Sequence, residues 1–254
     1  MRIPYCEGLK LQGMRPIQED SFRSHAERGI FSVADGFGGP IPGANASECA
    51  CESVDAYLSR GSRDPDATLP FVLRSYLSLA GNVLLNAVAY ANQKILEENK
   101  KKNINERGGS SLVSGYLDGD LLTLASVGSC HAWLLRGNHY SSLITPRTYE
   151  RLLSPTDVSG TSRWAGKSQT PLMALGMVED LEPEMVEYRV ESGDWLILHT
   201  DGLRLSQIQA SFEKILGIKQ KKLNKQQSAQ EVLSFMSEIS KESSDNTSIL
   251  LVLL

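Results

Sequence analysis

Four short acidic motifs hold the side chains most able to carry out chemistry, and each lies where an apolar run meets a turn. They are Arg15-Pro16-Ile17-Gln18-Glu19-Asp20, Val33-Ala34-Asp35-Gly36, His199-Thr200-Asp201-Gly202 and Ser244-Asp245-Asn246. Three of them adjoin strand-like segments that are able to converge at one end of a sheet. Carboxylates gathered with almost no histidine or cysteine nearby are ligands for hard divalent cations. The sequence therefore predicts a divalent-metal site.

The expected geometry of this site suits phosphate chemistry. Asp35 and Asp201 each follow an apolar segment and precede glycine, which permits a sharp turn, and Asp245 precedes the last apolar segment. If these segments are neighbouring strands, the three carboxylates repel one another and divalent cations relieve that repulsion. Two cations bridged by one carboxylate lie about 3.5–4 Å apart, an arrangement that activates water for in-line attack on phosphorus.

A single motif of this kind has a simpler explanation. An isolated Asp-Gly is usually only a turn, which is how we interpret Asp118-Gly119 and also Asp194. Glu19-Asp20 alone also fits a solvated pair. The occurrence of four acidic motifs in this order favours a common site.

Composition narrows the class of protein. The chain has 254 residues and a net charge of −4, a balance that argues against a nucleic-acid partner. Its four cysteines form no C-x-x-C pair and its four histidines show no zinc-ligand spacing, so reduced thiols and no zinc site are expected. No apolar run has the length of a signal peptide or a membrane span. We therefore expect one cytoplasmic domain over residues 1–254, with no membrane role.

Hydrophobic periodicity predicts seven strands and four helices. The strands are expected at 31–34, 111–117, 121–127, 131–135, 186–190, 195–199 and 247–254, and the helices at 43–60, from Pro70 to about 96, at 207–216 and at 229–240. The helix from Pro70 carries an apolar stripe at Leu73, Leu77, Ala80, Leu84, Ala87, Ala91 and Ile95. Asp118-Gly119-Asp120 predicts a hairpin between its flanking strands.

These elements predict the fold class. Segments 195–198 and 249–252 are apolar on both faces, so each must be covered on both sides. With hairpins and helices available, we expect an α+β fold, a four-layer α/β/β/α sandwich of two packed antiparallel sheets flanked by helices. The stretch from about 140 to 170, rich in Ser, Thr, Pro and Gly, is expected to be a surface flap.

The ordered motifs resemble those of the protein phosphatase 2C family, the metal-dependent serine/threonine protein phosphatases, in the form of free-standing bacterial catalytic domains. The resemblance runs from about Gly13 to the C-terminus. Besides the acidic motifs it includes Phe37-Gly38-Gly39, Gly109-Ser110-Ser111, Ala174-Leu175-Gly176, Leu203 and Thr247-Ser248.

The resemblance implies a function and a role for each site residue. The function would be hydrolysis of phosphoserine or phosphothreonine in proteins by a hydroxide that bridges two Mn²⁺ or Mg²⁺ ions. The implied catalytic residues are Arg15, which would bind the substrate phosphate, Asp35, which would bridge both ions, and Asp201. Asp201 and Asp245 would complete one metal site, and Glu19 with the carbonyl of Gly36 would hold the other. Asp20 and Asn246 would support these ligands without contacting the ions.

Partners also follow from the resemblance. The substrate would be a phosphorylated protein, the product of a serine/threonine kinase. The chain would act as a monomer in signalling.

Two positions depart from the family pattern. Phe37 stands where many animal members have a histidine proposed to protonate the leaving oxygen, and phenylalanine cannot donate that proton. Gly128-Ser129-Cys130-His131 stands where the family has G-D-S-R, whose aspartate helps to bind a third metal ion. A serine hydroxyl is a poor substitute, so the third site is expected to be weak or absent. Cys130 and His131 should point to opposite faces of a strand and have structural roles.

Two other functions remain open at this point. Phe37 and Ser129 would fit a pseudophosphatase that binds a phosphoprotein as a regulatory module without turnover, although all five acids are kept. A metal-dependent nuclease would use the same cluster of carboxylates, but the sequence shows no series of basic or aromatic residues suited to binding nucleic acid.

Overall fold

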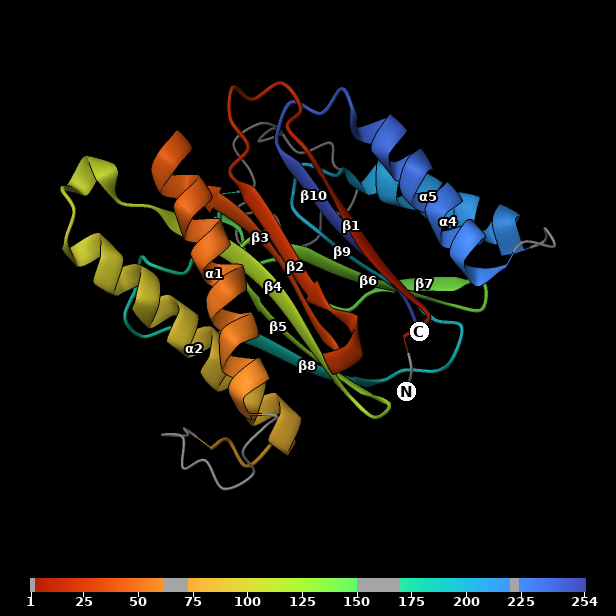
Figure 1. Cartoon of the computed structure of the whole chain (residues 1–254), viewed down its shortest axis with the longest axis horizontal. Coiled ribbons are helices and arrows are strands. Elements are labelled where there is room, and N and C mark those ends of the chain that lie inside the picture. Colours follow the sequence, from red (N-terminus) through yellow and green to blue (C-terminus); the bar gives the residue numbers. More distant parts are fainter. Residues whose placement is uncertain (1–2, 62–72, 150–169, 220–223) are drawn as a thin grey trace.

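The chain forms two five-stranded antiparallel sheets packed face to face, with helices on both outer faces (Figure 1). The structure is a computed structural model and describes residues 3–61, 73–149, 170–219 and 224–254. The four-layer α+β sandwich expected from the sequence is thereby confirmed.

The first sheet has the strand order β2-β3-β4-β5-β8. Its strands are β2 (Asp20–His25), β3 (Ile30–Phe37), β4 (Gly109–Asp118), β5 (Leu121–Val127) and β8 (Glu184–Arg189). Helices α1 (Pro40–Gly61) and α2 (Leu79–Lys100) cover its outer face (Figure 1). Two short 3₁₀ turns, Ala26–Arg28 and Ile104–Glu106, lie in connections.

The second sheet has the order β1-β10-β9-β6-β7. Its strands are β1 (Tyr5–Leu11), β10 (Thr247–Leu253), β9 (Trp195–His199), β6 (His131–Arg136) and β7 (His139–Ser142). Helices α4 (Leu205–Lys219) and α5 (Lys225–Ser240) cover it. No helix in the described part of the chain is both long and apolar enough to cross a bilayer.

Three hydrophobic cores hold the four layers together. The central core lies between the sheets and includes Phe31, Val113, Leu198 and Leu250. A second core lies beneath α1 and α2, and a third beneath α4 and α5. Because β9 and β10 contribute residues to two cores, their apolar pattern on both faces is explained.

The expected elements are present with adjusted boundaries. The hairpin at Asp118 is confirmed, and Gly119 adopts φ +64 in its turn. Strand β3 continues through Asp35 and Gly36 to Phe37, past the expected end at Asp35. The expected flap begins within β7, and its residues 150–169 lie outside the described residues.

The expected start of the second helix was wrong. Helix α2 begins at Leu79, where the side chain of Ser78 accepts a hydrogen bond from the Gly81 N–H and caps the helix. Leu73 precedes the helix and is 67% exposed, whereas Leu84 and Ile95 are buried as predicted. Pro70 lies outside the described residues.

Candidate metal centre

One end of the two sheets gathers residues from all four acidic motifs. Arg15 and Glu19 lie between β1 and β2, Asp35 and Gly36 lie near the end of β3, Asp201 follows β9, and Asp245 with Asn246 precedes β10. All seven line one open cavity of about 880 Å³. The structure therefore brings together every residue that the sequence suggested for direct contact with an ion or with phosphate.

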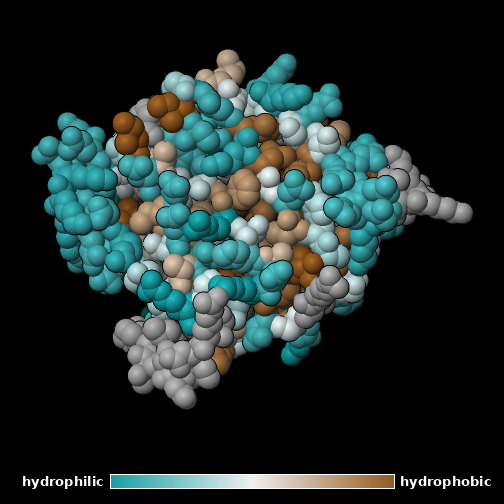
Figure 2. All heavy atoms as spheres, viewed as in Figure 1, coloured by the Kyte–Doolittle hydropathy of each residue, from teal (hydrophilic) through white to brown (hydrophobic). Residues whose placement is uncertain are grey.

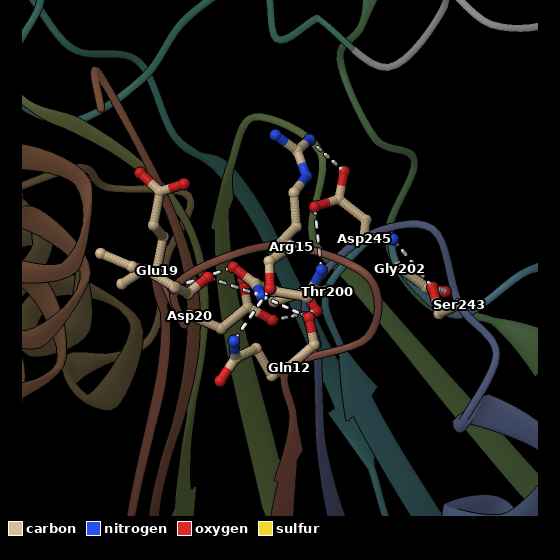
Figure 3. A network of polar contacts seen from close by, with 10 residues as sticks. Gln12, Arg15, Glu19, Asp20, Thr200, Gly202, Ser243 and Asp245 are labelled. Atoms are coloured by element: carbon tan, nitrogen blue, oxygen red, sulfur yellow. Dashed lines mark hydrogen bonds and ion pairs between the residues drawn. The ribbon is translucent and has the colours of Figure 1, made fainter. Parts of the chain in front are cut away.

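Asp20 lies beneath this cavity and supports it. It is the antiparallel partner of Asp35 across β2 and β3, and it is 4% exposed. The hydroxyl of Thr200 donates to its Oδ2 at 2.7 Å and accepts from the Ser248 N–H at 2.9 Å. Figure 3 shows Asp20 directed toward Thr200, whereas the Glu19 carboxylate points away from it. Asp20 thus ties the two sheets together behind the ligands.

The side chain of Asn246 fixes the segment that carries Arg15 and Glu19. Its Nδ2 donates to the carbonyl oxygens of Gln12 at 2.8 Å and Ile17 at 3.0 Å. Its Oδ1 accepts from the Glu19 N–H at 2.8 Å. Because Asn246 is 4% exposed, these three bonds are shielded from water. Asn246 therefore ties the start of β10 to the segment that carries Arg15 and Glu19.

Arg15 pairs with one of the acids that it was expected to accompany. Its Nη2 lies 2.6 Å from Oδ2 of Asp245, and the two side chains are 50% and 41% exposed. Figure 3 shows both side chains, together with that of Glu19, pointing to the same side of the strand ends. A guanidinium in this position is able to bind the oxygens of a phosphate in the cavity.

Two glycines permit the close approach of chain segments around the site. A Cβ at Gly202 would collide with the backbone oxygen of Asn246, so only glycine lets the turn after Asp201 lie against Asn246. A Cβ at Gly36 would likewise collide with the carbonyl of Gly43 in α1. The glycines after Asp35 and Asp201 are therefore required by packing as well as by the turn.

The buried carboxylates strongly disfavour their own ionisation. Burial, together with the charges of Asp245 and Asp20, raises the pKa of Asp201 to about 7. Burial likewise raises the pKa of Asp20 to about 6. The pKa of Asp35 is raised well above its usual range by burial and by the charges of Asp201 and Asp20. A cluster of this kind gains free energy when cations neutralise it.

The donor set fits hard divalent cations. Oε1 of Glu19 and Oδ1 of Asp20 are buried oxygens without a hydrogen-bond partner, an arrangement that favours a positively charged ligand or a proton. In the described residues, no three carboxylate, imidazole or thiol groups are already gathered at metal-binding distances.

Phe37 and the segment 129–131, which depart from the family pattern, are packed against neighbouring residues. Phe37 lines the cavity, and its ring lies against Gly109, where a Cβ would contact it. Ser129 is buried, its Oγ lies 3.1 Å from Ser111 Oγ, and it hydrogen-bonds Asp201. Cys130 packs in the central core, while His131 stacks on His199 with ring centroids 4.7 Å apart. Cys130 and His131 thus lie on opposite faces, as expected.

Several residues that shape the site were missed by sequence reasoning. Ser47 of α1 donates from its hydroxyl to the Glu19 carbonyl at 2.5 Å, and Thr200 holds Asp20. Asn92 and Asn99 of α2 hold the segment that forms one wall of the cavity. The two asparagines are seven residues apart and belong to a set of four buried asparagines in α2, with Asn82 and Asn86, and this recurrence of asparagine in an amphipathic helix was the available signal.

Comparison with known protein families identifies the chain's relatives. Residues 15–250 match the family model for protein phosphatase 2C. The chain belongs to the protein phosphatase 2C family. By this membership it is a protein serine/threonine phosphatase, an enzyme of a metal-dependent family. A search of curated protein sequences finds no match.

Several bacterial phosphatases of known structure have a similar fold. The serine/threonine phosphatase PstP/Ppp of Mycobacterium tuberculosis has a TM-score of 0.76 and 20% identity, with 98% of each chain covered. A PstP catalytic domain solved with two manganese ions has a TM-score of 0.74 and 20% identity, with 98% of this chain and 97% of that chain covered. Stp1 of Staphylococcus aureus has a TM-score of 0.77 and 16% identity, with 100% of this chain and 96% of that chain covered.

Proposed function

We propose that this protein phosphatase 2C member hydrolyses phosphoserine and phosphothreonine in proteins with two divalent cations, Mn²⁺ or Mg²⁺. One observation carries the proposal. Four carboxylates and one guanidinium, from segments far apart in the chain, line the same cavity. Such a set of groups binds cations and a phosphate ester together.

The ligand roles follow from position. Asp35 lines the cavity and is affected by the charges of Asp201, Asp20 and Asp245, so we assign it to both ions; Asp201 and Asp245 would help to hold one ion, and Glu19 with the Gly36 carbonyl would help to hold the other. When bound, two such ions supply positive charge at the phosphoryl oxygens and a hydroxide nucleophile at neutral pH. A PstP catalytic domain solved in complex with two manganese ions supports this number.

The protein's own side chains position the substrate. Arg15 binds the phosphoryl oxygens with its planar guanidinium. When the phosphate binds, it replaces Asp245 as the partner of this guanidinium. Asn246 holds the Arg15–Glu19 segment in place, and Asp20 holds the β2–β3 end. Phe37 provides an apolar surface beside the reacting group and cannot donate a proton to the leaving oxygen.

A third ion is not part of this proposal. Ser129 takes the place of the family's additional aspartate, and its hydroxyl is engaged with Ser111 and Asp201. A neutral hydroxyl held in this way adds no charge for another cation. We therefore assign Ser129 to positioning Asp201, with the third site weak or absent.

The proposal also covers the oligomeric state, the cellular compartment and the source of the substrate. We propose a monomer that acts in the cytosol on proteins phosphorylated by a serine/threonine kinase. The four cysteines are free thiols, which suits a reducing compartment.

Phosphate release from a phosphothreonine peptide tests the proposed function. We expect release that requires Mn²⁺ or Mg²⁺, stops with a chelator, and falls at least about 1,000-fold in Asp201→Asn, because that change removes a charged ligand of one ion. The matched control is Asp118→Asn, an isosteric change at an exposed hairpin residue away from the cavity. Turnover by Asp201→Asn at the wild-type rate would contradict the proposal.

The same assay separates the enzyme from a binding module. A pseudophosphatase would bind the peptide without releasing phosphate. Retention of Glu19, Asp35, Asp201 and Asp245 along one cavity supports turnover.

A further inference from the structure

The cavity extends well beyond the space needed for a phosphoryl group. Its volume of about 880 Å³ is in the range of sites that enclose ligands of drug size. The acidic residues and Arg15 occupy one side. The other side is an apolar wall, which we define as Pro171, Leu172, Met173, Ala174, Met177 and Val178. A substrate held by its phosphate therefore has room to place neighbouring residues against this wall.

The wall exposes hydrophobic side chains to solvent. Met177 is 63% exposed, Leu172 is 39% exposed and Val178 is 36% exposed. Figure 2 shows further hydrophobic residues at the surface where α1 begins, next to the Gly38–Gly39 turn that also lines the cavity. Contiguous exposed apolar surface is uncommon on a folded domain and marks places where a partner binds.

The backbone of the wall is held rigidly by α2 and β4. Asn92 accepts from the Gly176 N–H and donates to the Val178 carbonyl, both at 2.8 Å. Asn99 donates to the Gly176 carbonyl at 3.0 Å. Leu175 pairs with Ser110 through two backbone hydrogen bonds of 2.9 and 3.1 Å. The exposed side chains thus stand on a fixed support, which lowers the entropic cost of binding to them.

The charges near the wall disfavour acidic substrate residues. Arg15 is the only cation among the described residues that line the cavity, and it serves the phosphate. Glu179, Asp180 and Glu182 follow the wall and are exposed. Two cationic side chains lie close to the wall. Lys100 forms an ion pair with Glu179, and the guanidinium of Arg147 donates a hydrogen bond to the Glu182 carbonyl. Within the described part of the cavity lining, an acidic residue beside the phosphorylated one finds no cation other than Arg15.

We propose that the apolar wall binds an aliphatic side chain next to the phosphorylated serine or threonine of the substrate protein. This inference rests on the proposed function and specifies its substrate class. Substrates with apolar residues flanking the phosphate are preferred, and substrates with acidic flanks are disfavoured.

Three phosphothreonine peptides test the inference. They are identical except that both residues flanking the phosphothreonine are leucine, alanine or glutamate. We expect kcat/KM for the leucine peptide to exceed that for the alanine peptide about tenfold, because apolar surface is buried against the wall. The glutamate peptide should be the poorest substrate. Met177→Ser should reduce the leucine-to-alanine ratio to about two.

A control variant and a binding measurement keep the outcomes distinct. Leu79→Ser removes another exposed apolar side chain, at the first residue of α2 and outside the cavity lining, and should keep the wild-type ratio. Fluorescence anisotropy of the same peptides with the Mn²⁺-loaded protein should show the same order of affinities. If all three peptides are hydrolysed and bound equally, the apolar wall has no such role. If none is hydrolysed, the proposed function fails, and the anisotropy order still decides whether the wall binds apolar flanks.

Discussion

Nη2 of Arg15 lies 2.6 Å from Oδ2 of Asp245, although 230 residues separate the two in the chain. One of these residues is assigned to phosphate and the other to a cation. Their pairing should therefore couple the binding of phosphate to the binding of the cation. If an ion binds Asp245 as proposed, it should release the Arg15 guanidinium and leave it free to bind phosphate.

Substitution of Arg15 tests this coupling. Arg15→Ala should lower kcat/KM for a phosphothreonine peptide by about 10- to 100-fold, because charge-assisted hydrogen bonds to phosphate are lost. Arg15→Lys should recover only part of that loss, because an ammonium lacks the planar pair of donors. Calorimetry should show Mn²⁺ bound at least as tightly to Arg15→Ala as to the wild type, since Asp245 no longer has a competing partner. Weaker Mn²⁺ binding would show that the pair does not compete with the ion.

Asn246→Ala should lower stability more than the loss of an exposed asparagine such as Asn224. It removes three buried hydrogen bonds to Gln12, Ile17 and Glu19, for an expected cost of about 2–4 kcal/mol in the free energy of unfolding. Asn224→Ala, which removes only the exposed cap of α5, should cost about 1 kcal/mol. Urea unfolding of both variants measures the difference. Equal costs would show that Asn246 does not hold the Arg15–Glu19 segment.

The buried carboxylates predict how the stability of the metal-free protein depends on pH. Aspartate in an unfolded chain has a pKa of about 3.9. Burial raises the pKa of Asp20 to about 6 and that of Asp201 to about 7, so the folded protein keeps protons that the unfolded chain has lost. The free energy of unfolding in chelator should therefore fall as the pH rises from about 4 to about 7.

Urea unfolding at pH 5 and pH 7.5 checks this slope. Asp201→Asn removes one titrating group and should make the slope shallower. Mn²⁺ should add more stability at pH 7.5 than at pH 5, because its ligands must be ionised. A metal-free stability that rises across this window would contradict the assigned electrostatics.

Ser129 predicts the number and strength of metal sites. Ser129→Ala removes the hydrogen bond to Asp201 and should weaken Mn²⁺ binding about tenfold. Ser129→Asp adds a carboxylate beside Asp201 and should produce a further, weaker Mn²⁺ site in calorimetry. Ser114→Ala, which removes a buried hydroxyl bonded to Ser32 and Phe31, is the control and should leave Mn²⁺ binding unchanged. An unaltered titration curve for Ser129→Asp would place residue 129 outside the reach of the ions.

Much of the fold and the site could be predicted because the signals were local. The motifs around Asp35, Asp201 and Asp245 combine an apolar strand with a turn, and the hairpin at Asp118 depends on adjacent residues. Strands β1, β2 and β7 were missed because their sequences are polar on one face or wholly exposed. β1, moreover, is defined by pairing with β10 at the other end of the chain. Such non-local pairing leaves little trace in a single sequence.

The support around the ligands was harder to predict for the same reason. The register that places Asp20 opposite Asp35 depends on how β2 pairs with β3. The contacts from Asn92 and Asn99 to the cavity wall depend on where α2 lies against the sheet. Residue types, their order and the family resemblance suggested the candidate ligands, whereas the residues that support them required the tertiary structure.

Titration of the metal-free protein with Mn²⁺ by calorimetry, compared between the wild type and Asp35→Asn, tests the two-ion centre most directly. We expect two ions per wild-type chain. Because Asp35 is assigned to both ions, Asp35→Asn should weaken both sites by at least about tenfold. Asp118→Asn should bind two ions as the wild type does. Two ions bound by Asp35→Asn with wild-type affinity would contradict the bridging role of Asp35 and the centre built on it.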